Sequence, residues 1–181
     1  MIYNHQRKVR LNIKAIEGFA SELRREMKLG RRWFDVAFVN DLKMRRLNTK
    51  FRRKQKPTDV LSFPWVWDLE PSRVRKVGKD DLNGFTGDVI ISAETARRDA
   101  AEERSTLDLK IRQLMLHGVL HLLGYDHETD DGEMHALEYK LRRKFRIDSS
   151  NRSGASRKSM SKRQVNARPQ MGSGLGKGVI A

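Results

Sequence analysis

Residues 117–127 of the chain read HGVLHLLGYDH, and three of these residues are histidines. His117 and His121 are four residues apart, so on a helix their side chains lie on the same face, one turn apart. The residues around them, LMLHGVLHLL, are apolar on nearly every side, which predicts a buried helix. Gly124 follows the apolar run and favours a left-handed helix end, which would turn His127 back towards the other two histidines.

This histidine pattern indicates a metal site. Burying two imidazoles in an apolar helix is costly unless each has a polar partner, and one metal ion satisfies both. Three neutral imidazoles with a free coordination position are typical of catalytic zinc, and the chain has no cysteine to offer instead. We therefore predict one divalent ion, Zn²⁺ before the other metals, bound by His117, His121 and His127. Nickel, copper and iron also accept imidazole ligands, so the residues leave the metal open.

The same spacing holds zinc in metzincin peptidases, H-E-x-x-H-x-x-G-x-x-H, where the glutamate is the general base. Here Gly118 stands at that position, so the proton must be taken by another group. The candidates are Asp126, an RNA 2′-hydroxyl and metal-bound hydroxide, although Asp126 is equally suited to orienting a histidine or shaping a turn. Glycine inside a helix costs roughly 1 kcal/mol relative to alanine. Gly118 thus predicts either a close approach of substrate or close helix–sheet packing.

The charge of the chain favours a polyanionic partner. Its 38 Lys and Arg residues outnumber 23 Asp and Glu residues, a net charge of +15, which favours nucleic acid before an anionic membrane. Four of the cations stand in a predicted basic loop, FRRKQKP, at 51–57: Arg52, Arg53, Lys54 and Lys56. Arginine can hold a phosphate through two hydrogen bonds and stabilise charge developing in a transition state. We predict that these four residues bind RNA phosphate, the alternative being a solvated basic loop.

Apolar periodicity and capping residues predict one α/β (α+β) domain, with a small sheet and about four or five helices. The predicted strands are a short N-terminal strand, 33–39, 58–67 and 87–92, and the predicted helices are 14–29, a helix through Leu42, Met44 and Leu47, 93–104, 106–123 and 131–146. Helix starts are expected at Asn40 or Asp41, at Ser92, at Ser105 with Asp108, and at Asp130 with Glu133. Residues 68–86 are expected to form a loop.

The domain is expected to cover residues 1–147 and to be followed by a disordered basic tail, 148–181. The tail contains seven cations, one acid and many Ser and Gly residues, too little apolar surface to offset the entropy of ordering. Residues 1–147 keep a net charge of +9. No apolar run is long enough for a spanning helix and no secretory signal precedes the domain, so a cytoplasmic protein without membrane partners is expected.

Three stretches together resemble the YbeY family of bacterial endoribonucleases and ribosomal RNA maturation factors. They are LNTKFRRKQKPTDVLSFP at 47–64, GDVIIS at 87–92 and HGVLHLLGYDH at 117–127. The resemblance implies a mixed sheet, a zinc-type ion on the three histidines, and Arg52 as the functionally important, catalytic arginine. It covers residues 1–147 and excludes the tail.

The resemblance also implies an activity and partners. The activity would be metal-dependent cleavage of single-stranded RNA in small-subunit ribosomal RNA 3′-end maturation and ribosome quality control. The partners would be ribosomal RNA, the small ribosomal subunit, a small-subunit ribosomal protein and an Era-like GTPase. Two alternatives stand beside this hypothesis: a metzincin-like metallopeptidase, and a non-enzymatic ribosome assembly factor with a structural metal.

Overall fold

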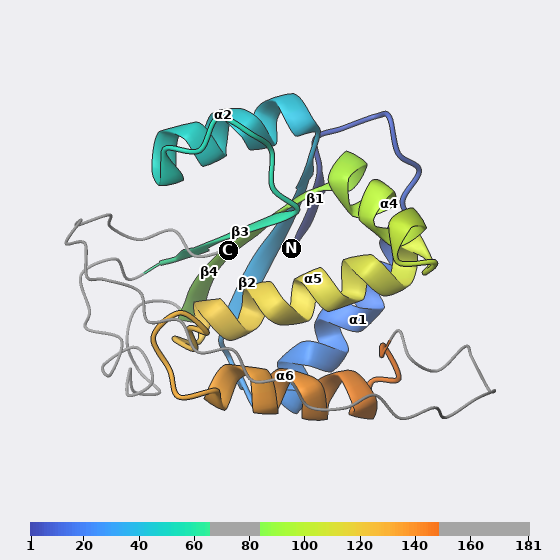
Figure 1. The fold of residues 1–181 in the computed structure, drawn as a ribbon. Coiled ribbons are helices and arrows are strands. Elements are labelled where there is room, and N and C mark those ends of the chain that lie inside the picture. Colours follow the sequence, from blue (N-terminus) through green and yellow to red (C-terminus); the bar gives the residue numbers. More distant parts are fainter. Residues whose placement is uncertain (66–83, 149–181) are drawn as a thin grey trace, which may run out of the picture.

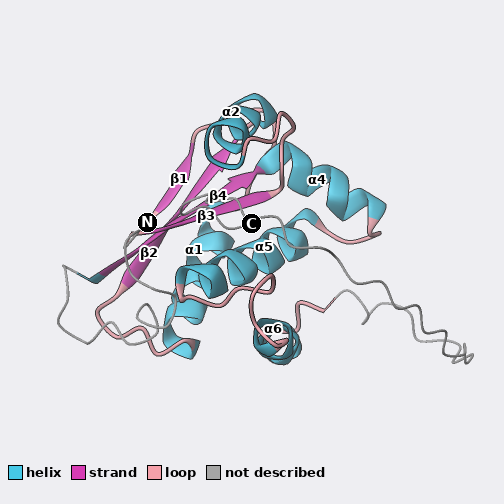
Figure 2. Cartoon of the chain, turned by 60° about the vertical axis from the view of Figure 1, so that its left-hand side comes forward, coloured by secondary structure: helices cyan, strands magenta, loops and turns pink. Residues whose placement is uncertain are grey.

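The computed structural model describes residues 1–65 and 84–148, which form a four-stranded mixed sheet with helices on both faces (Figures 1 and 2). The strand order is β1-β2-β4-β3, and the strands are β1 (Ile2–Asn4), β2 (Trp33–Val39), β3 (Val60–Pro64) and β4 (Phe85–Ser92). β1 and β4 run parallel to β2, whereas β3 is antiparallel to β4 and forms an edge of the sheet. The predicted α/β class and the small mixed sheet are confirmed.

Five helices lie within the described residues: α1 (Ile13–Glu26), α2 (Asp41–Arg52), α4 (Ala93–Glu102), α5 (Leu107–Leu122) and α6 (Glu133–Lys144). Figure 1 shows α2 on one face of the sheet and α1 and α5 on the other, with α6 packed outside α5. A large core fills the α1–α5 side, and a smaller one, centred on Met44, Leu61 and Phe63, lies under α2. Because α5 is covered by the sheet and by helices, it is apolar on most sides, as the sequence predicts.

Two of the predicted helix starts are confirmed. The Asn40 side chain accepts a hydrogen bond from the Lys43 N–H at 2.9 Å and caps α2. Ser92 Oγ accepts from the Thr95 N–H at 3.3 Å and caps α4. Both side chains satisfy a backbone donor that has no partner inside its own helix.

Two other predicted starts need correction. α5 is capped by Thr106, whose Oγ1 accepts from the Leu109 N–H at 3.2 Å, and not by Ser105. The N-cap of α6 is Gly132, at a φ of 94°. Asp130 still serves this helix, because its carboxylate accepts from the N–H groups of Gly132 and Met134, each at 2.9 Å.

Several element boundaries also differ from the prediction. The predicted basic loop at 51–57 begins inside α2, because Phe51 packs edge-on against Phe63, with ring centroids 5.0 Å apart, and extends the helix to Arg52. The predicted loop 68–86 ends earlier, since Phe85 pairs with Trp33 at the start of β4. The predicted strand 58–67 is shortened to β3, and its residues 66–67 lie outside the described part.

The remaining predictions for weakly patterned segments are not covered by the structure. Most of the predicted loop 68–86 and the predicted tail, apart from Asp148, lie outside the described residues. Among the described helices, none combines the length and apolar character needed to span a membrane.

Candidate metal centre

The C-terminal end of α5 positions the first part of the site. Gly124 adopts a φ of 85°, and its N–H donates to the His121 carbonyl at 3.0 Å, while the Tyr125 N–H donates to the Leu120 carbonyl at 3.1 Å. This paired closure is the Schellman motif, which favours glycine because the residue is left-handed. It brings the Tyr125 carbonyl to 2.9 Å from His121 Nδ1, which donates to it. The predicted role of Gly124 is confirmed.

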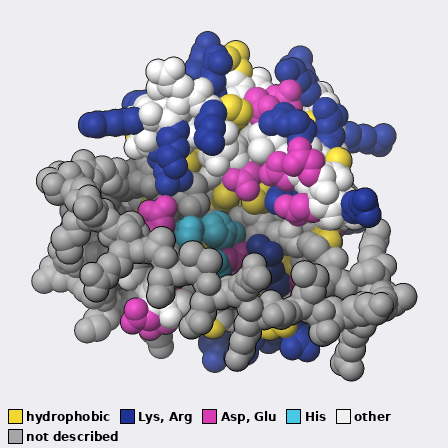
Figure 3. Space-filling view, viewed as in Figure 1, with side chains coloured by type: hydrophobic (Ala, Val, Ile, Leu, Met, Phe, Trp, Pro, Cys, Tyr) yellow, Lys and Arg dark blue, Asp and Glu magenta, His cyan; other side chains and the backbone are white. Residues whose placement is uncertain are grey.

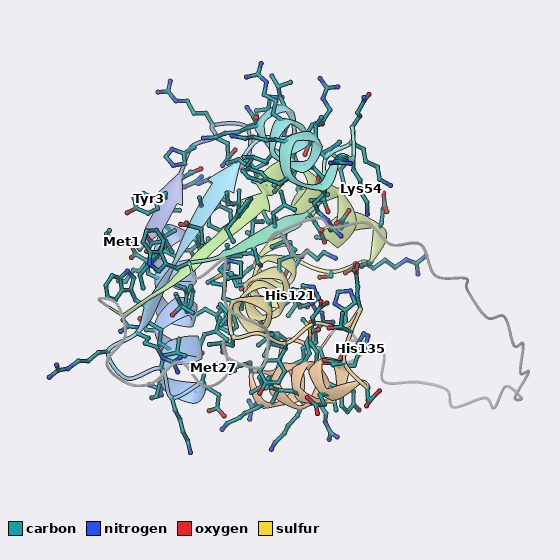
Figure 4. The ribbon with its side chains drawn as sticks, turned by 90° about the vertical axis from the view of Figure 1, so that its left-hand side faces the viewer. Met1, Tyr3, Met27, Lys54, His121 and His135 are labelled. Atoms are coloured by element: carbon teal, nitrogen blue, oxygen red, sulfur yellow. The ribbon has the colours of Figure 1, made fainter. Side chains whose placement is uncertain are left out.

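The three predicted histidines converge. One nitrogen from each of His117, His121 and His127 lies within 4.8 Å of the others. His117 Nε2 and His121 Nε2 are 3.1 Å apart, one turn apart on α5, and His127 reaches them from the turn that follows. Figure 4 shows His121 between α5 and the segment that leads to α6. The spacing in the sequence therefore predicted a real cluster, which a single ion can bridge.

A carboxylate on α6 orients His117. Glu138 Oε2 lies 3.2 Å from His117 Nδ1, and Arg142 donates two hydrogen bonds to Glu138 Oε1, at 2.6 and 3.1 Å. With the Nδ1 atoms of His117 and His121 both occupied, their Nε2 lone pairs face a common point. Metal-bound histidines usually donate their second N–H to such a carboxylate or carbonyl.

Glu138 and Arg142 were not predicted from the sequence. The available signal was the position of Glu138, which falls on the same helical face as Met134 and Leu141 and is buried like them. A carboxylate on an apolar face needs a partner, and the nearest basic partner on the helix is four residues later.

The electrostatics favour neutral imidazole at the buried histidine. Burial lowers the pKa of His121 to about 4, and the nearby His117 and His127 act in the same direction. Burial opposes ionisation of Glu138, but the hydrogen bond and charge of His117, together with Arg142, hold its pKa below the ordinary value. Metal ions bind neutral imidazole, so His121 is already in the protonation state that a metal ligand requires.

His127 gives a second indication that the cluster fits a metal. Its Nδ1 atom is buried and has no hydrogen-bond partner among the described residues. A buried ring nitrogen without a partner is destabilising unless something else satisfies it. The donor set of three imidazoles suits zinc and other borderline divalent ions, and an ion bound by His127 would be a partner for its ring.

Gly118 faces the sheet. A Cβ placed on it would lie 2.6 Å from Val89 Cγ1 and 3.1 Å from Ser62 Oγ. Ser62 Oγ also donates to the Gly118 carbonyl at 3.1 Å. Of the two interpretations of this glycine, close helix–sheet packing is therefore the one that the geometry supports. A side chain at this position would have to displace the Val89 side chain, so the glutamate of the peptidase motif does not fit here without repacking.

The histidines open into a cleft of about 620 Å³. It is lined by His117 and His127, from α5 and the turn after it, here called the histidine side, and by Arg52 and Lys54, from the end of α2 and the segment after it, here called the cation side. Arg52 approaches the carboxylate of Glu128, with an N–O distance of 3.7 Å. In the space-filling view the histidine side chains are visible at the surface below the α2 region (Figure 3). The cleft thus joins a candidate metal site to positive charge.

The structure separates the four predicted phosphate-binding cations. Arg52 and Lys54 line the cleft, whereas Arg53 and Lys56 are exposed and are not among its lining residues. Lys56 has a backbone role as well, because its carbonyl accepts a hydrogen bond from Asn48 Nδ2 at 2.7 Å. Phosphate binding by each of these side chains stays a prediction.

Asp126 has a structural role in the turn. Its Oδ1 atom accepts from the Glu128 N–H at 3.0 Å, and its carbonyl accepts from Thr129 and Asp130. This carboxylate raises the pKa of His121 slightly through its charge, against the stronger effect of burial. The contacts agree with the interpretation of Asp126 as a turn residue, and its role as a base stays a prediction.

Known proteins share this sequence and fold. The family model described as "Endoribonuclease YbeY" matches residues 1–146. A protein named Endoribonuclease YbeY from Solibacter usitatus is 45% identical over 131 residues, which cover 72% of this chain and 78% of that protein. One of the same name from Koribacter versatilis is 45% identical over 115 residues, 64% of this chain. The chain spans 66% of that relative's length.

A solved structure has a similar fold. The solution structure of TM1509 from Thermotoga maritima superposes with a TM-score of 0.52 at 26% sequence identity, covering 87% of this chain and all of that one. Because the family model matches well over half of the chain, the resemblance predicted from three short motifs is confirmed. The chain belongs to the YbeY family of endoribonucleases.

Proposed function

We propose that this chain is a metal-dependent endoribonuclease that cuts single-stranded RNA, with Zn²⁺ as its ion. The observation that carries the proposal is a cluster of three imidazoles that opens into a cleft walled by Arg52 and Lys54. The relatives named as endoribonucleases and the net charge of +15 support an RNA substrate.

The protein side chains have separate roles in this proposal. His117, His121 and His127 would hold the ion, while Glu138 and the Tyr125 carbonyl fix the orientation of two of the rings. When bound, a divalent ion in such a site polarises a phosphoryl oxygen and acidifies water. Arg52 lies across the cleft, where its guanidinium can pair with a phosphate oxygen and stabilise charge that develops on it.

A phosphate that reaches Arg52 would compete with Glu128. The Arg52–Glu128 contact is long, and the Glu128 side chain is 65% exposed, so the pair is weak and readily exchanged. Arg52 itself is only 19% exposed and lines the cleft. The arginine is therefore available to a substrate without a large cost for breaking its present contact.

We further propose that the RNA is ribosomal, and that the protein acts in the cytoplasm in small-subunit 3′-end maturation and ribosome quality control. This part is supported by the family alone. The partners that we propose with it are the small ribosomal subunit, a small-subunit ribosomal protein and an Era-like GTPase. Accumulation of an unprocessed small-subunit RNA precursor in cells that lack the protein would be the expected result.

The test of the activity compares purified zinc-loaded protein on RNA and on peptide. Single-stranded RNA should be cut more readily than duplex RNA at a matched, stated salt concentration, because phosphate contacts weaken steeply with salt. Zinc-dependent hydrolysis of peptides without RNA cleavage would replace the proposal by the metallopeptidase alternative.

A further inference from the structure

α2 carries an unusual concentration of unpaired positive charge. Its twelve residues include five cations and one acid. Four of these cations, here called the α2 cations, are exposed: Lys43, Arg45, Arg46 and Lys50. None of the four forms an ion pair with a carboxylate within the described residues.

The single acid of α2 is already engaged. The Asp41 carboxylate accepts hydrogen bonds from Ser92, Thr95 and Arg98, at 2.5, 2.7 and 2.6 Å. These contacts tie α2 to the start of α4. They leave no negative charge on α2 to neutralise the α2 cations.

Some cations on other helices are paired with a carboxylate, whereas Lys14 and Arg25 of α1 have no such partner within the described residues. Lys110 of α5, Arg142 of α6 and Lys144 of α6 each have a carboxylate oxygen at 2.6 Å. The charge of those helices is thus partly neutralised inside the protein. The α2 cations keep theirs, and Figure 3 shows Lys and Arg side chains gathered over the α2 region.

The position of α2 connects this charge to the cleft. The helix ends at Arg52, which lines the cleft, and residues 53–59 then lead around the edge of the sheet to β3. Lys43 and Lys50 are about 10 Å apart along the axis at 1.5 Å per residue, which matches about three phosphates of one stacked nucleic acid strand at most. A strand that leaves the cleft past Arg52 can therefore reach the α2 cations.

We propose that the α2 cations bind the phosphate backbone of RNA outside the cleft and independently of its sequence. This surface would make long single strands better substrates than short ones. The inference rests on the proposed function, because it takes the strand in the cleft to be RNA. An anionic membrane fits less well: Leu42, 50% exposed, is the one large apolar side chain exposed on α2, and a membrane-surface helix needs an apolar face.

The test uses the zinc-loaded protein and a variant in which all four α2 cations are replaced by glutamine. Lysine, arginine and glutamine have similar helix propensities and the side chains are exposed, so the variant should fold, which circular dichroism checks. A control variant carries the same loss of charge at exposed positions of α1 and α6, which lie on the other side of the sheet from α2 (Figure 1): Lys14, Arg25, Lys140 and Arg143, all to Gln.

Affinity is measured on single-stranded 2′-O-methyl RNA of about five and about twenty nucleotides, over a range of salt concentrations. The RNA is recovered after each titration and checked on a gel to be intact, so that binding is read separately from cleavage. For the long strand, the α2 variant should bind about tenfold or more weakly than the wild type. Its slope of log K against log salt should be shallower by about 0.7 for each phosphate that the variant no longer neutralises. The short strand should bind about equally to all three proteins.

Three results would overturn the inference. One is an equal loss of affinity in the α2 variant and the control, which would mean that RNA affinity depends on net charge and not on the position of the cations. Another is an equal loss of affinity on both strand lengths. The third is unchanged RNA binding with lost binding to phosphatidylglycerol vesicles, which would make α2 a membrane-facing surface. Failure of the wild type to cut any RNA would instead count against the proposed function, and the binding measurement would still decide the role of α2.

Discussion

The two sides of the cleft hold their side chains in different ways. On the histidine side, His117 and His121 are each fixed by a hydrogen bond at Nδ1, and a buried glutamate and an arginine stand behind His117. On the cation side, Arg52 has a single carboxylate at 3.7 Å, and Lys54 is exposed. The first arrangement suits a ligand with strict geometry, such as a metal ion, and the second suits a flexible polyanion whose phosphates arrive in varied positions.

The largest effect is expected on the cation side. Arg52→Ala should lower kcat/KM for RNA by about 10²–10³-fold, because a charged donor aimed at the reacting phosphate is removed. Metal content should not change, since Arg52 is not a ligand. The matched control is Arg25→Ala, an exposed arginine of α1 outside the cleft, with at most a few-fold decrease. Equal decreases in the two variants, measured by initial rates, would remove the special role of Arg52.

A substitution on the histidine side should change the affinity for the metal ion. Glu138→Gln keeps the shape of the side chain but removes the charge that orients His117, and it should weaken zinc binding by about 10–100-fold. Glu17→Gln, an exposed change of the same kind on α1, should leave zinc binding unaltered. A competition titration with a chelating dye measures both. If Glu138→Gln binds zinc like the wild type, Glu138 is only a packing partner of Arg142.

The packing of α5 against the sheet predicts that two glycine substitutions change the free energy of unfolding in opposite directions. Gly118→Ala should reduce the free energy of unfolding by about 1–3 kcal/mol, because the new methyl group overlaps Val89 and outweighs the gain in helix propensity. Gly18→Ala, on an exposed position of α1 with no atom within 4 Å of the new Cβ, should instead stabilise by up to about 1 kcal/mol. Denaturant unfolding that gave both changes the same sign would contradict this packing.

A further effect is a pH dependence of the metal-free protein. The pKa of His121 is about 4 when folded and about 6.5 when unfolded, so the unfolded state binds more protons between these values. Stability from this group is therefore present above about pH 6.5 and is lost as the pH falls towards about 4. Unfolding curves of wild type and His121→Gln should converge as the pH decreases across this window. A constant difference between them would show that His121 does not titrate with a lowered pKa.

The histidine side could be predicted from sequence because its geometry is local. His117, His121 and Gly124 belong to one helix and its end, where helical periodicity and the left-handed preference of glycine fix the arrangement. The strand 33–39 and the caps at Asn40 and Ser92 were predictable for the same reason. The cap of α5 is Thr106 and not Ser105. The two adjacent hydroxyl residues are both good N-cap residues, so their identity alone does not show which of them begins the helix.

The rest of the site depends on contacts between distant segments. Glu138 reaches His117 from another helix, and Arg52 at the end of α2 lines the same cleft as the histidines although α2 and α5 lie on opposite faces of the sheet. Phe51 extends α2 into the predicted loop through its contact with Phe63, a residue on a later strand. A pattern in a single stretch of sequence does not contain these pairings.

The central claim is that the three histidines hold an ion on which RNA cleavage depends. The most direct measurement is metal content per chain together with single-stranded RNA cleavage, for wild type and His117→Ala purified side by side and shown to be folded by circular dichroism. We expect about one ion per chain and RNA cleavage in the wild type, with both abolished in the variant. Equal cleavage by a metal-free His117→Ala protein, at a rate that follows the concentration of the folded chain through purification, would contradict the claim.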